Sequence, residues 1–282
     1  MNVPIMVFAP HSGFFDSLLV VYLNFVSVIG RAGADEVFIF GNLTKLCQPI
    51  IVDRDQHSSR LNSINKVKER VNSKLGWPPL SVYPEGTCTN RKELVQFKSG
   101  AFIPGLPVQP VCIKYGDNEM DTVSWTWEGP HPLTLCWLLL CQLNLPIEFN
   151  FLPVYNPNEE EQQNAEVYAE NVRRLMAKEL EIGLSELSYE DGRLRMIANK
   201  HKLKFRIGDI KVQQVKKKYN INMDIIFEML NYFAGLASRQ TGVCHLDQFA
   251  QNLGLELNES VTKLFEVFDL VSQIELISKV FL

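Results

Sequence analysis

A histidine and a carboxylate stand five residues apart near the start of the chain, at His11 and Asp16. A histidine can take a proton from an alcohol near neutral pH, and a neighbouring carboxylate can orient the ring and stabilise the imidazolium. In a regular helix, residues five apart point about 140° away from each other. We therefore expect a turn over Ser12 and Gly13, which glycine favours, to bring the two side chains together. The pair predicts general-base chemistry.

A second polar group, Glu85-Gly86-Thr87, follows an apolar run at residues 80–83. A turn at this place presents backbone amides and a hydroxyl to a substrate oxygen. We therefore predict that Glu85, Gly86 and Thr87 form a turn that binds an anion or a hydroxyl group. Cys88 comes next, and we interpret it as a small buried thiol rather than as a nucleophile.

One arginine is placed to bind an anion, because Arg54 follows the apolar run Ile50–Val52. Its guanidinium can form a bidentate clamp on a phosphate. A salt bridge is the alternative role for Arg54. Its partner in that salt bridge would be Asp53, Asp55 or Glu85. The second candidates for holding a phosphate are Arg60 and Lys45.

Short apolar runs alternate with helical patterns up to about residue 155, which is typical of an α/β fold. We expect helices at residues 17–29 and 60–75, and strands at 4–9, 50–52, 80–83 and 108–115. Ligands of such sheets bind beyond the carboxyl ends of the strands. Because His11 and Glu85 both follow predicted strands, the two motifs are expected to meet at one edge of the sheet.

Composition argues against several classes of protein. A net charge of -4 does not favour a nucleic-acid partner. The 6 cysteines contain no Cys-x-x-Cys pair, so we predict neither a zinc site nor a disulfide framework. No run reaches the ~20 apolar residues that a membrane span needs, and no signal peptide is expected.

Residues 133–145 form the apolar stretch that is hardest to interpret, and they include Trp137. We favour a buried core element. The alternative is a segment that lies in a membrane interface, with the tryptophan at headgroup depth. The basic stretch from Lys200 to Lys218 is interpreted as a solvated linker, with weak attraction to an anionic membrane as its alternative.

Taken together, these motifs resemble the glycerophospholipid acyltransferase superfamily of the lysophosphatidic acid acyltransferase type. That family carries a His-x-x-x-x-Asp motif, an arginine motif, a Pro-Glu-Gly-Thr motif and a later proline motif. The matching segments here are His11 with Asp16, Ile51–Arg54, Tyr83–Thr87 and Val108–Val111. The flanking segments resemble the lysophosphatidylcholine acyltransferase branch, and they are 84–91, 97–105, 125–127 and 148–155.

The resemblance implies an α/β acyltransferase domain over residues 1–198, with a central mixed sheet flanked by helices. It implies transfer of an acyl group from acyl-CoA, a co-substrate, to the free hydroxyl of a lysophospholipid, with lysophosphatidylcholine favoured. No metal and no other cofactor are implied. His11 would be the base and Asp16 would hold it. Glu85, Gly86 and Thr87 would position the acceptor, and Arg54 would hold its phosphate.

The resemblance also implies a membrane surface as a partner, at the endoplasmic reticulum and facing the cytosol, with lipid droplets as an alternative location. Family members carry a hydrophobic anchor before the histidine motif, and we expect such an upstream segment to be missing from this chain. Two alternatives to the main function stay open. One is a truncated, inactive isoform with a binding or regulatory role, and the other is the same chemistry on lysophosphatidic acid.

Residues 199–282 are expected to form a linker and a small, incomplete helical region that resembles an EF-hand. A calcium loop that begins at Asp269 would need oxygen ligands at its third and fifth positions, glycine at the sixth and a carboxylate at the twelfth. The residues at those positions are Val271, Gln273, Ile274 and Val280. We therefore predict no calcium binding at Asp269.

Overall fold

The computed structural model describes residues 3–31, 40–52, 57–73, 75–116, 124–126 and 129–200, with shorter pieces at 225–228, 231, 245–259, 261–263 and 265. The chain divides into two compact units, Met1–Glu186 and Leu187–Leu282. The predicted domain boundary at 198/199 stays a prediction, although helix α7 (Tyr189–Lys200) runs through that position. Asp269 and the calcium prediction attached to it lie outside the described residues.

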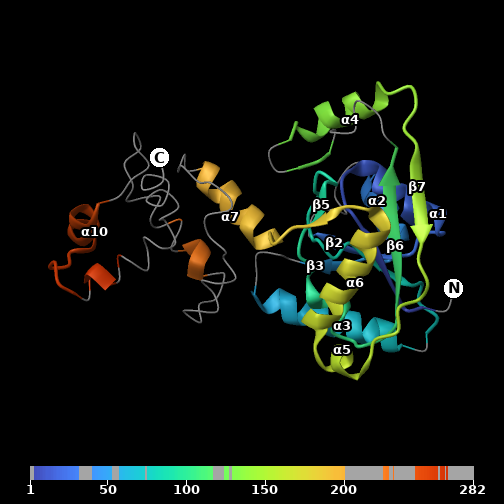
Figure 1. Ribbon diagram of the computed structural model, residues 1–282, viewed down its shortest axis with the longest axis horizontal. Helices are drawn as coiled ribbons and strands as arrows, with labels where there is room; N and C mark the ends of the chain where they lie inside the picture. The colour runs from blue at the N-terminus through green and yellow to red at the C-terminus, as the bar shows by residue number, and fades with distance from the viewer. Residues whose placement is uncertain are drawn as a thin grey trace. The chain divides into compact units, whose positions relative to one another are not determined.

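The first unit is built on a six-stranded sheet with the order β3-β2-β4-β1-β6-β7 (Figure 1). Its strands are β1 Ile5–Ala9, β2 Ser27–Arg31, β3 Ile50–Val52, β4 Leu80–Val82, β6 Val108–Tyr115 and β7 Ile147–Phe151. Neighbouring strands run parallel, except for the antiparallel pair β6 and β7. The predicted α/β fold with a central mixed sheet is confirmed.

Helices cover both faces of this sheet (Figure 1). They are η1 Phe14–Ser17, α1 Leu18–Tyr22, α2 Phe40–Leu46, α3 His57–Asn72, η3 Ser99–Ala101, α4 Pro132–Leu140, α5 Glu159–Gln163 and α6 Ala165–Leu180. A small parallel pair joins β5 Glu93–Leu94 to β8 Gly183–Leu184. In the second unit the structure describes α7 and α10 Leu246–Leu253.

Strand β1 lies between β4 and β6, and all five of its residues are buried. Side chains alternate between the two faces of a strand. Ile5, Val7 and Ala9 therefore join the core under α6, whereas Met6 and Phe8 join the core under α1. Each large apolar side chain buried in this way contributes roughly 1.5–3 kcal/mol. The strand that ends just before the histidine motif is thus held from both sides.

The predicted helix over residues 17–29 is wrong beyond Tyr22. Helix α1 ends there, and Asn24 and Phe25 turn the chain with φ values of 57° and 59°. Strand β2 then begins at Ser27. The sequence after the turn is rich in β-branched residues, which pack well in a strand.

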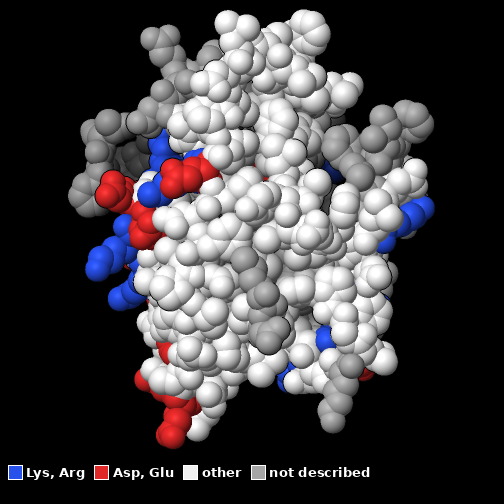
Figure 2. Space-filling model, turned by 90° about the vertical axis from the view of Figure 1, so that its right-hand side faces the viewer, with Lys and Arg blue, Asp and Glu red and all other residues white. Residues whose placement is uncertain are grey.

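The buried-core interpretation of residues 133–145 is wrong for the outer side of α4. Leu135 and Leu139 are buried, but Leu133 and Trp137 are 76% and 67% exposed. Figure 2 shows the side of the first unit that carries β7 and α1, where charged side chains gather at the margins rather than in the middle. No helix in the described part of the chain is long and apolar enough to cross a membrane.

Candidate active site

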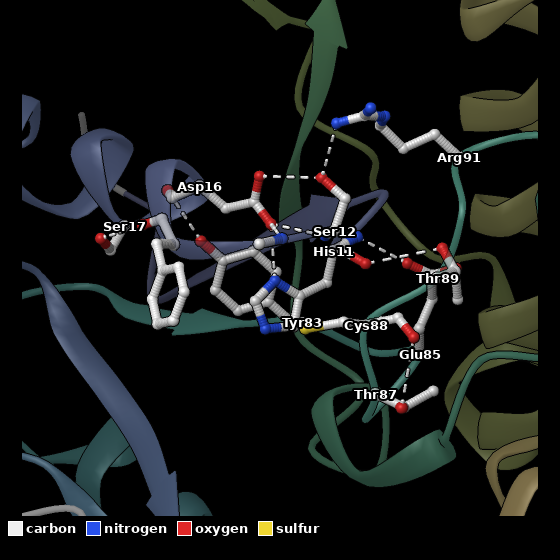
Figure 3. A network of polar contacts seen from close by, with 12 residues as sticks. His11, Ser12, Asp16, Ser17, Tyr83, Glu85, Thr87, Cys88, Thr89 and Arg91 are labelled. Atoms are coloured by element: carbon white, nitrogen blue, oxygen red, sulfur yellow. Dashed lines mark hydrogen bonds and ion pairs between the residues drawn. The ribbon is translucent and has the colours of Figure 1, made fainter. Parts of the chain in front are cut away.

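The two halves of the first motif meet just beyond the carboxyl end of β1. His11 lies in the loop after the strand and Asp16 lies in η1. His11 Nδ1 and Asp16 Oδ2 are 2.7 Å apart, with the histidine side chain 28% exposed and the aspartate side chain fully buried (Figure 3). The predicted meeting of the two side chains is confirmed, although Gly13 is extended, with φ -179° and ψ -165°. The backbone N–H groups of Ser12 and Gly13 both donate to Asp16 Oδ2, at 2.6 and 2.9 Å.

Asp16 is held as a charged acceptor inside the protein. Besides His11 and the two backbone donors, its carboxylate accepts hydrogen bonds from Ser12 Oγ and from the Tyr115 hydroxyl. Burial raises the pKa of this carboxyl, but the hydrogen bond and charge of His11, with the donors at Tyr115 and Gly13, outweigh it and lower the pKa below 3.8. The side chain is therefore ionised at neutral pH.

The His11 ring is fixed on its other sides by Tyr83 and Cys88. The Tyr83 ring stacks on it with centroids 4.2 Å apart, and the Cys88 side chain is hydrogen-bonded to it. Figure 3 shows the Cys88 sulfur beside the ring nitrogen that does not face Asp16. Cys88 is only half-buried, so the interpretation of a merely buried thiol is incomplete.

The protonation of His11 follows from these neighbours. Burial lowers the pKa of the imidazole, but the hydrogen bonds and charges of Asp16 and Cys88 outweigh it and raise the pKa to about 10. At neutral pH the His11–Asp16 dyad therefore rests as an imidazolium and a carboxylate. The ring must lose its proton before it can act as a base, so the reactive form increases as pH rises.

Glu85 is brought to His11, as the sequence predicts, but it faces inward. The side chain is fully buried, and Oε2 accepts the backbone N–H of His11 at 2.7 Å. Burial raises the pKa of Glu85 to about 7, against the lowering effect of hydrogen bonds from His11, Val95 and Thr89. These protein donors hold the carboxylate against the His11 loop, and the predicted role of Glu85 in positioning an acceptor stays a prediction.

Gly86 and Thr87 form the turn that follows β4. Gly86 has φ +68°, and a Cβ at this position would lie 2.8 Å from Lys98 Cε, so glycine allows the close approach of the lysine. Thr87 is half-buried, and its hydroxyl lies 3.4 Å from the backbone oxygen of Cys88. Because β4 and β1 are parallel neighbours, this turn and the histidine loop share one edge of the sheet.

The structure describes only some of the residues that were predicted to hold a phosphate. Arg54 lies outside the described residues, and its role stays a prediction. Of the second candidates, Lys45 is exposed in α2 and Arg60 belongs to α3. No group of three or more His, Cys, Asp or Glu side chains within the described ranges is arranged to hold a metal ion.

Two residues beside the dyad were not predicted from the sequence. Tyr115, the last residue of β6, donates to the Asp16 carboxylate. The Arg91 guanidinium carbon lies 4.3 Å from the centroid of the Tyr115 ring, and Nη1 lies 3.4 Å from Ser12 Oγ. Arg91 also has a left-handed backbone with φ 65°. Neither residue forms a recognisable spacing with His11, so only the fold reveals them.

Comparison with known proteins found a matching family model and several similar proteins. Residues 2–114 match the model of the Acyltransferase family. Lysophosphatidylcholine acyltransferase 2 of Mus musculus is 40% identical over 270 residues, covering 95% of this chain and 49% of that protein. Lysophosphatidylcholine acyltransferase 1 of Danio rerio is 37% identical over 267 residues, covering 94% of this chain and 51% of that protein. The chain spans about half the length of these curated relatives.

Among solved structures, the 1-acyl-sn-glycerophosphate (LPA) acyltransferase of Thermotoga maritima is 17% identical, with a TM-score of 0.39 and coverage of 66% of this chain and 70% of that one. The family assignment rests on the family model and on the sequence relatives, which confirm the resemblance carried by the four motifs. The chain carries an Acyltransferase family domain over residues 2–114 and is similar over most of its length to the lysophosphatidylcholine acyltransferases.

Proposed function

We propose that this chain transfers an acyl group from acyl-CoA to the free hydroxyl of a lysophospholipid, with lysophosphatidylcholine as the preferred acceptor. The observation that carries the proposal is the 2.7 Å contact between His11 Nδ1 and Asp16 Oδ2 at the carboxyl end of β1. A histidine held by a buried carboxylate can take a proton from a hydroxyl through its second ring nitrogen, where the hydroxyl replaces the contact with Cys88. The relatives named above are named for this acceptor.

The reaction follows from the atoms of the dyad. In its neutral form, His11 takes the proton of the acceptor hydroxyl through Nε2, while Asp16 stabilises the imidazolium that forms. The acceptor oxygen attacks the thioester carbonyl, and the new ester bond forms as the carbon–sulfur bond breaks. The CoA thiolate leaves and takes the proton from His11. No covalent enzyme intermediate is required, and no cofactor besides acyl-CoA enters the steps.

The other site residues support these steps. Glu85 holds the backbone of His11, and Gly86 and Thr87 face the acceptor from the turn beside it. Arg54 is proposed to hold the acceptor's phosphate. The reaction is proposed to take place on the cytosolic side of the endoplasmic reticulum membrane, with lipid droplets as the alternative.

The purified chain, supplied with detergent or liposomes, tests the proposal. Release of free thiol from acyl-CoA is measured after addition of lysophosphatidylcholine, lysophosphatidic acid or glycerol 3-phosphate. His11→Ala should lower the rate by ~10²- to 10⁴-fold. His245→Ala, an exposed histidine in the second unit, is the matched control and should keep the wild-type rate.

The acceptor panel separates the remaining alternatives. A faster reaction with lysophosphatidic acid or glycerol 3-phosphate would change the acceptor and keep the dyad. Absence of thiol release with all three acceptors would favour an inactive chain with a binding or regulatory role. Equal release by wild type and His11→Ala would overturn the assignment of the base.

A further inference from the structure

A thiol that the proposed reaction does not use lies against the dyad. Cys88 is half-buried, is not part of a disulfide, and is hydrogen-bonded to the His11 ring. Figure 3 shows its sulfur beside the ring nitrogen that does not face Asp16. The other ring nitrogen, Nδ1, lies 2.7 Å from Asp16 Oδ2. The three side chains therefore stand in the order carboxylate, imidazole and thiol.

This order is the one that activates a nucleophile. Enzymes that use a cysteine or serine nucleophile place it within hydrogen-bond reach of a base, which a third group orients. Here Asp16 is fully buried and also accepts two backbone N–H groups, so its carboxylate is fixed. The Tyr83 ring stacks on the His11 ring with centroids 4.2 Å apart. The imidazole is therefore held with its second nitrogen toward Cys88.

The backbone keeps Cys88 at the histidine. The N–H of Thr89, the next residue, donates to the carbonyl oxygen of His11 at 2.7 Å. Three residues before Cys88, Glu85 accepts the His11 N–H at the same distance. The segment that carries the thiol is thus tied on both sides to the backbone of His11. The fold itself builds the contact, rather than the chance approach of a mobile side chain.

Cys88 and the acceptor require the same ring nitrogen. In the proposed reaction the acceptor gives its proton to His11 Nε2, and its oxygen attacks the thioester carbonyl. That carbonyl must then lie near Nε2, where the Cys88 sulfur already is. A thiol is intrinsically a stronger nucleophile than a hydroxyl and is partly ionised near neutral pH. Without an acceptor, Cys88 is therefore well placed to attack the thioester, and this step rests on the proposed function.

We propose that Cys88 is a site of S-acylation, where the thiol takes the acyl group from acyl-CoA when no acceptor is bound. His11 takes the proton from Sγ, and the sulfur attacks the carbonyl carbon. The bond between this carbon and the CoA sulfur breaks as the Cys88 thioester forms, and the CoA thiolate takes the proton from His11. Because one thioester replaces another, free CoA can reverse the reaction.

The acylated thiol blocks the base. Its sulfur no longer carries a proton, and the acyl chain lies against His11 Nε2, so an acceptor hydroxyl cannot reach that nitrogen. The chain then stays inactive until CoA or another thiol removes the acyl group. The active fraction therefore depends on the supply of acceptor and on the ratio of acyl-CoA to free CoA.

Mass spectrometry of the purified chain tests the site. Incubation with acyl-CoA and no acceptor should add one acyl group, which peptide mapping should place on Cys88. Neutral hydroxylamine, which cleaves thioesters, should remove it, and so should an excess of free CoA. Cys88→Ala should not gain the group at this position. His11→Ala should slow the acylation of Cys88 by about tenfold or more, because the thiol loses its base.

Cys141 provides the matched control within the same digest. It is an exposed thiol in the residue that follows α4. Any acylation of Cys141 should be equally fast in the wild type and in His11→Ala. Equal acylation of Cys88 in these two proteins would overturn the proposal, because the label would then report exposure alone. Thermal unfolding of each variant checks that the fold is kept.

The effect on turnover tests the block. Preincubation of the wild type with acyl-CoA should lower the initial rate after lysophosphatidylcholine is added, in proportion to the acylated fraction. Free CoA should restore that rate. The rate of Cys88→Ala should not change with preincubation. Transfer of the acyl group from Cys88 to the acceptor as fast as turnover would overturn the block, because Cys88 would then carry an intermediate.

The proposed function and the acylation site can fail separately. A chain that transfers the acyl group to lysophosphatidylcholine, while Cys88 stays unmodified without acceptor, would refute the acylation site alone. A chain that is acylated on Cys88 but transfers nothing to any acceptor would refute the proposed function and leave the site standing.

Discussion

The backbone of His11 is held on both sides by the turn that follows β4. Its N–H donates to Glu85 Oε2 at 2.7 Å, and its carbonyl oxygen accepts the Thr89 N–H at the same distance. Glu85 of the Pro-Glu-Gly-Thr motif and Thr89, two residues after the motif, therefore hold the backbone of His11 in place. In this view Glu85 is a positioning residue, and its effect on the reaction passes through His11.

Two variants of Glu85 test this role. Glu85→Gln keeps an oxygen that can accept the His11 N–H, so the fold should be kept and kcat should fall only several-fold. Glu85→Ala leaves a buried N–H without its acceptor, which should cost about 1–3 kcal/mol of unfolding free energy and lower kcat further. KM for the acceptor should stay close to the wild-type value in both variants. A large rise in KM with unchanged kcat would instead indicate direct contact with the acceptor.

The raised pKa of His11 predicts a pH dependence of the rate. Because the ring must be neutral to accept a proton, kcat/KM should rise with pH from neutrality toward about 10. Cys88 is one of the groups that raise this pKa. Cys88→Ala should therefore shift the rise of kcat/KM with pH (the rising limb of the pH profile) to lower pH and should leave the His11–Asp16 dyad working.

A matched cysteine variant controls that experiment. Cys141→Ala removes an exposed thiol at the end of α4 and should keep the wild-type limb. The measurement is the pH profile of thiol release for the three proteins. A limb that stays in place in Cys88→Ala would show that Asp16 alone sets the pKa of His11. Complete loss of turnover in this variant, with the fold intact, would give Cys88 a direct part in the reaction.

Much of this site was predictable from the sequence, because its motifs follow buried strands. Strands β1, β4 and β6 are short apolar runs, and the residues after them meet at one edge of the sheet. The His11–Asp16 contact is local, because Asp16 in η1 accepts from the His11 ring and from the backbone N–H groups of Ser12 and Gly13. Strand β2 was missed altogether, because the apolar residues before and after Phe25 look alike in a helix or a strand.

The partners of the dyad from distant segments could not be predicted. Tyr115 is 99 residues from Asp16, and Arg91 is 79 residues from Ser12. No periodicity links such positions, and only the pairing of β1 with β6 brings Tyr115 to the carboxylate. The exposed side of α4 agrees with only the alternative interpretation of this segment, because a run of leucines usually predicts burial.

Two tyrosines bind Asp16 in different ways and form a natural pair for mutation. Tyr115 donates to the carboxylate, whereas Tyr83 donates to the backbone oxygen at 3.0 Å. The pKa of Asp16 is lowered in the folded state, so its contribution to stability is present above pH 3.8 and is lost as pH falls through the folded pKa. Tyr115→Phe removes one cause of the lowering, so acid unfolding should begin at higher pH.

Tyr83→Phe is the control for this effect, because it leaves the donors to the carboxylate unchanged. Acid unfolding followed by tryptophan fluorescence should show a midpoint moved to higher pH for Tyr115→Phe relative to Tyr83→Phe. At neutral pH, Tyr115→Phe should cost about 1.5–3 kcal/mol of unfolding free energy, as expected for a lost hydrogen bond to a charged group. Equal midpoints in the two variants would show that Tyr115 does not help to keep Asp16 ionised.

Arg91 places a planar cation against the Tyr115 ring and within reach of Ser12, both of which touch Asp16. Arg91→Lys keeps the charge but loses the flat stack and the forked donors. If Arg91 holds this side of the dyad in place, kcat should fall about tenfold while KM for the acceptor stays constant. Lys92→Ala, at the exposed neighbouring position, should behave as wild type. A rise in KM for phosphate-bearing acceptors, with kcat unchanged, would mean that Arg91 contacts the phosphate itself and shares the role assigned to Arg54.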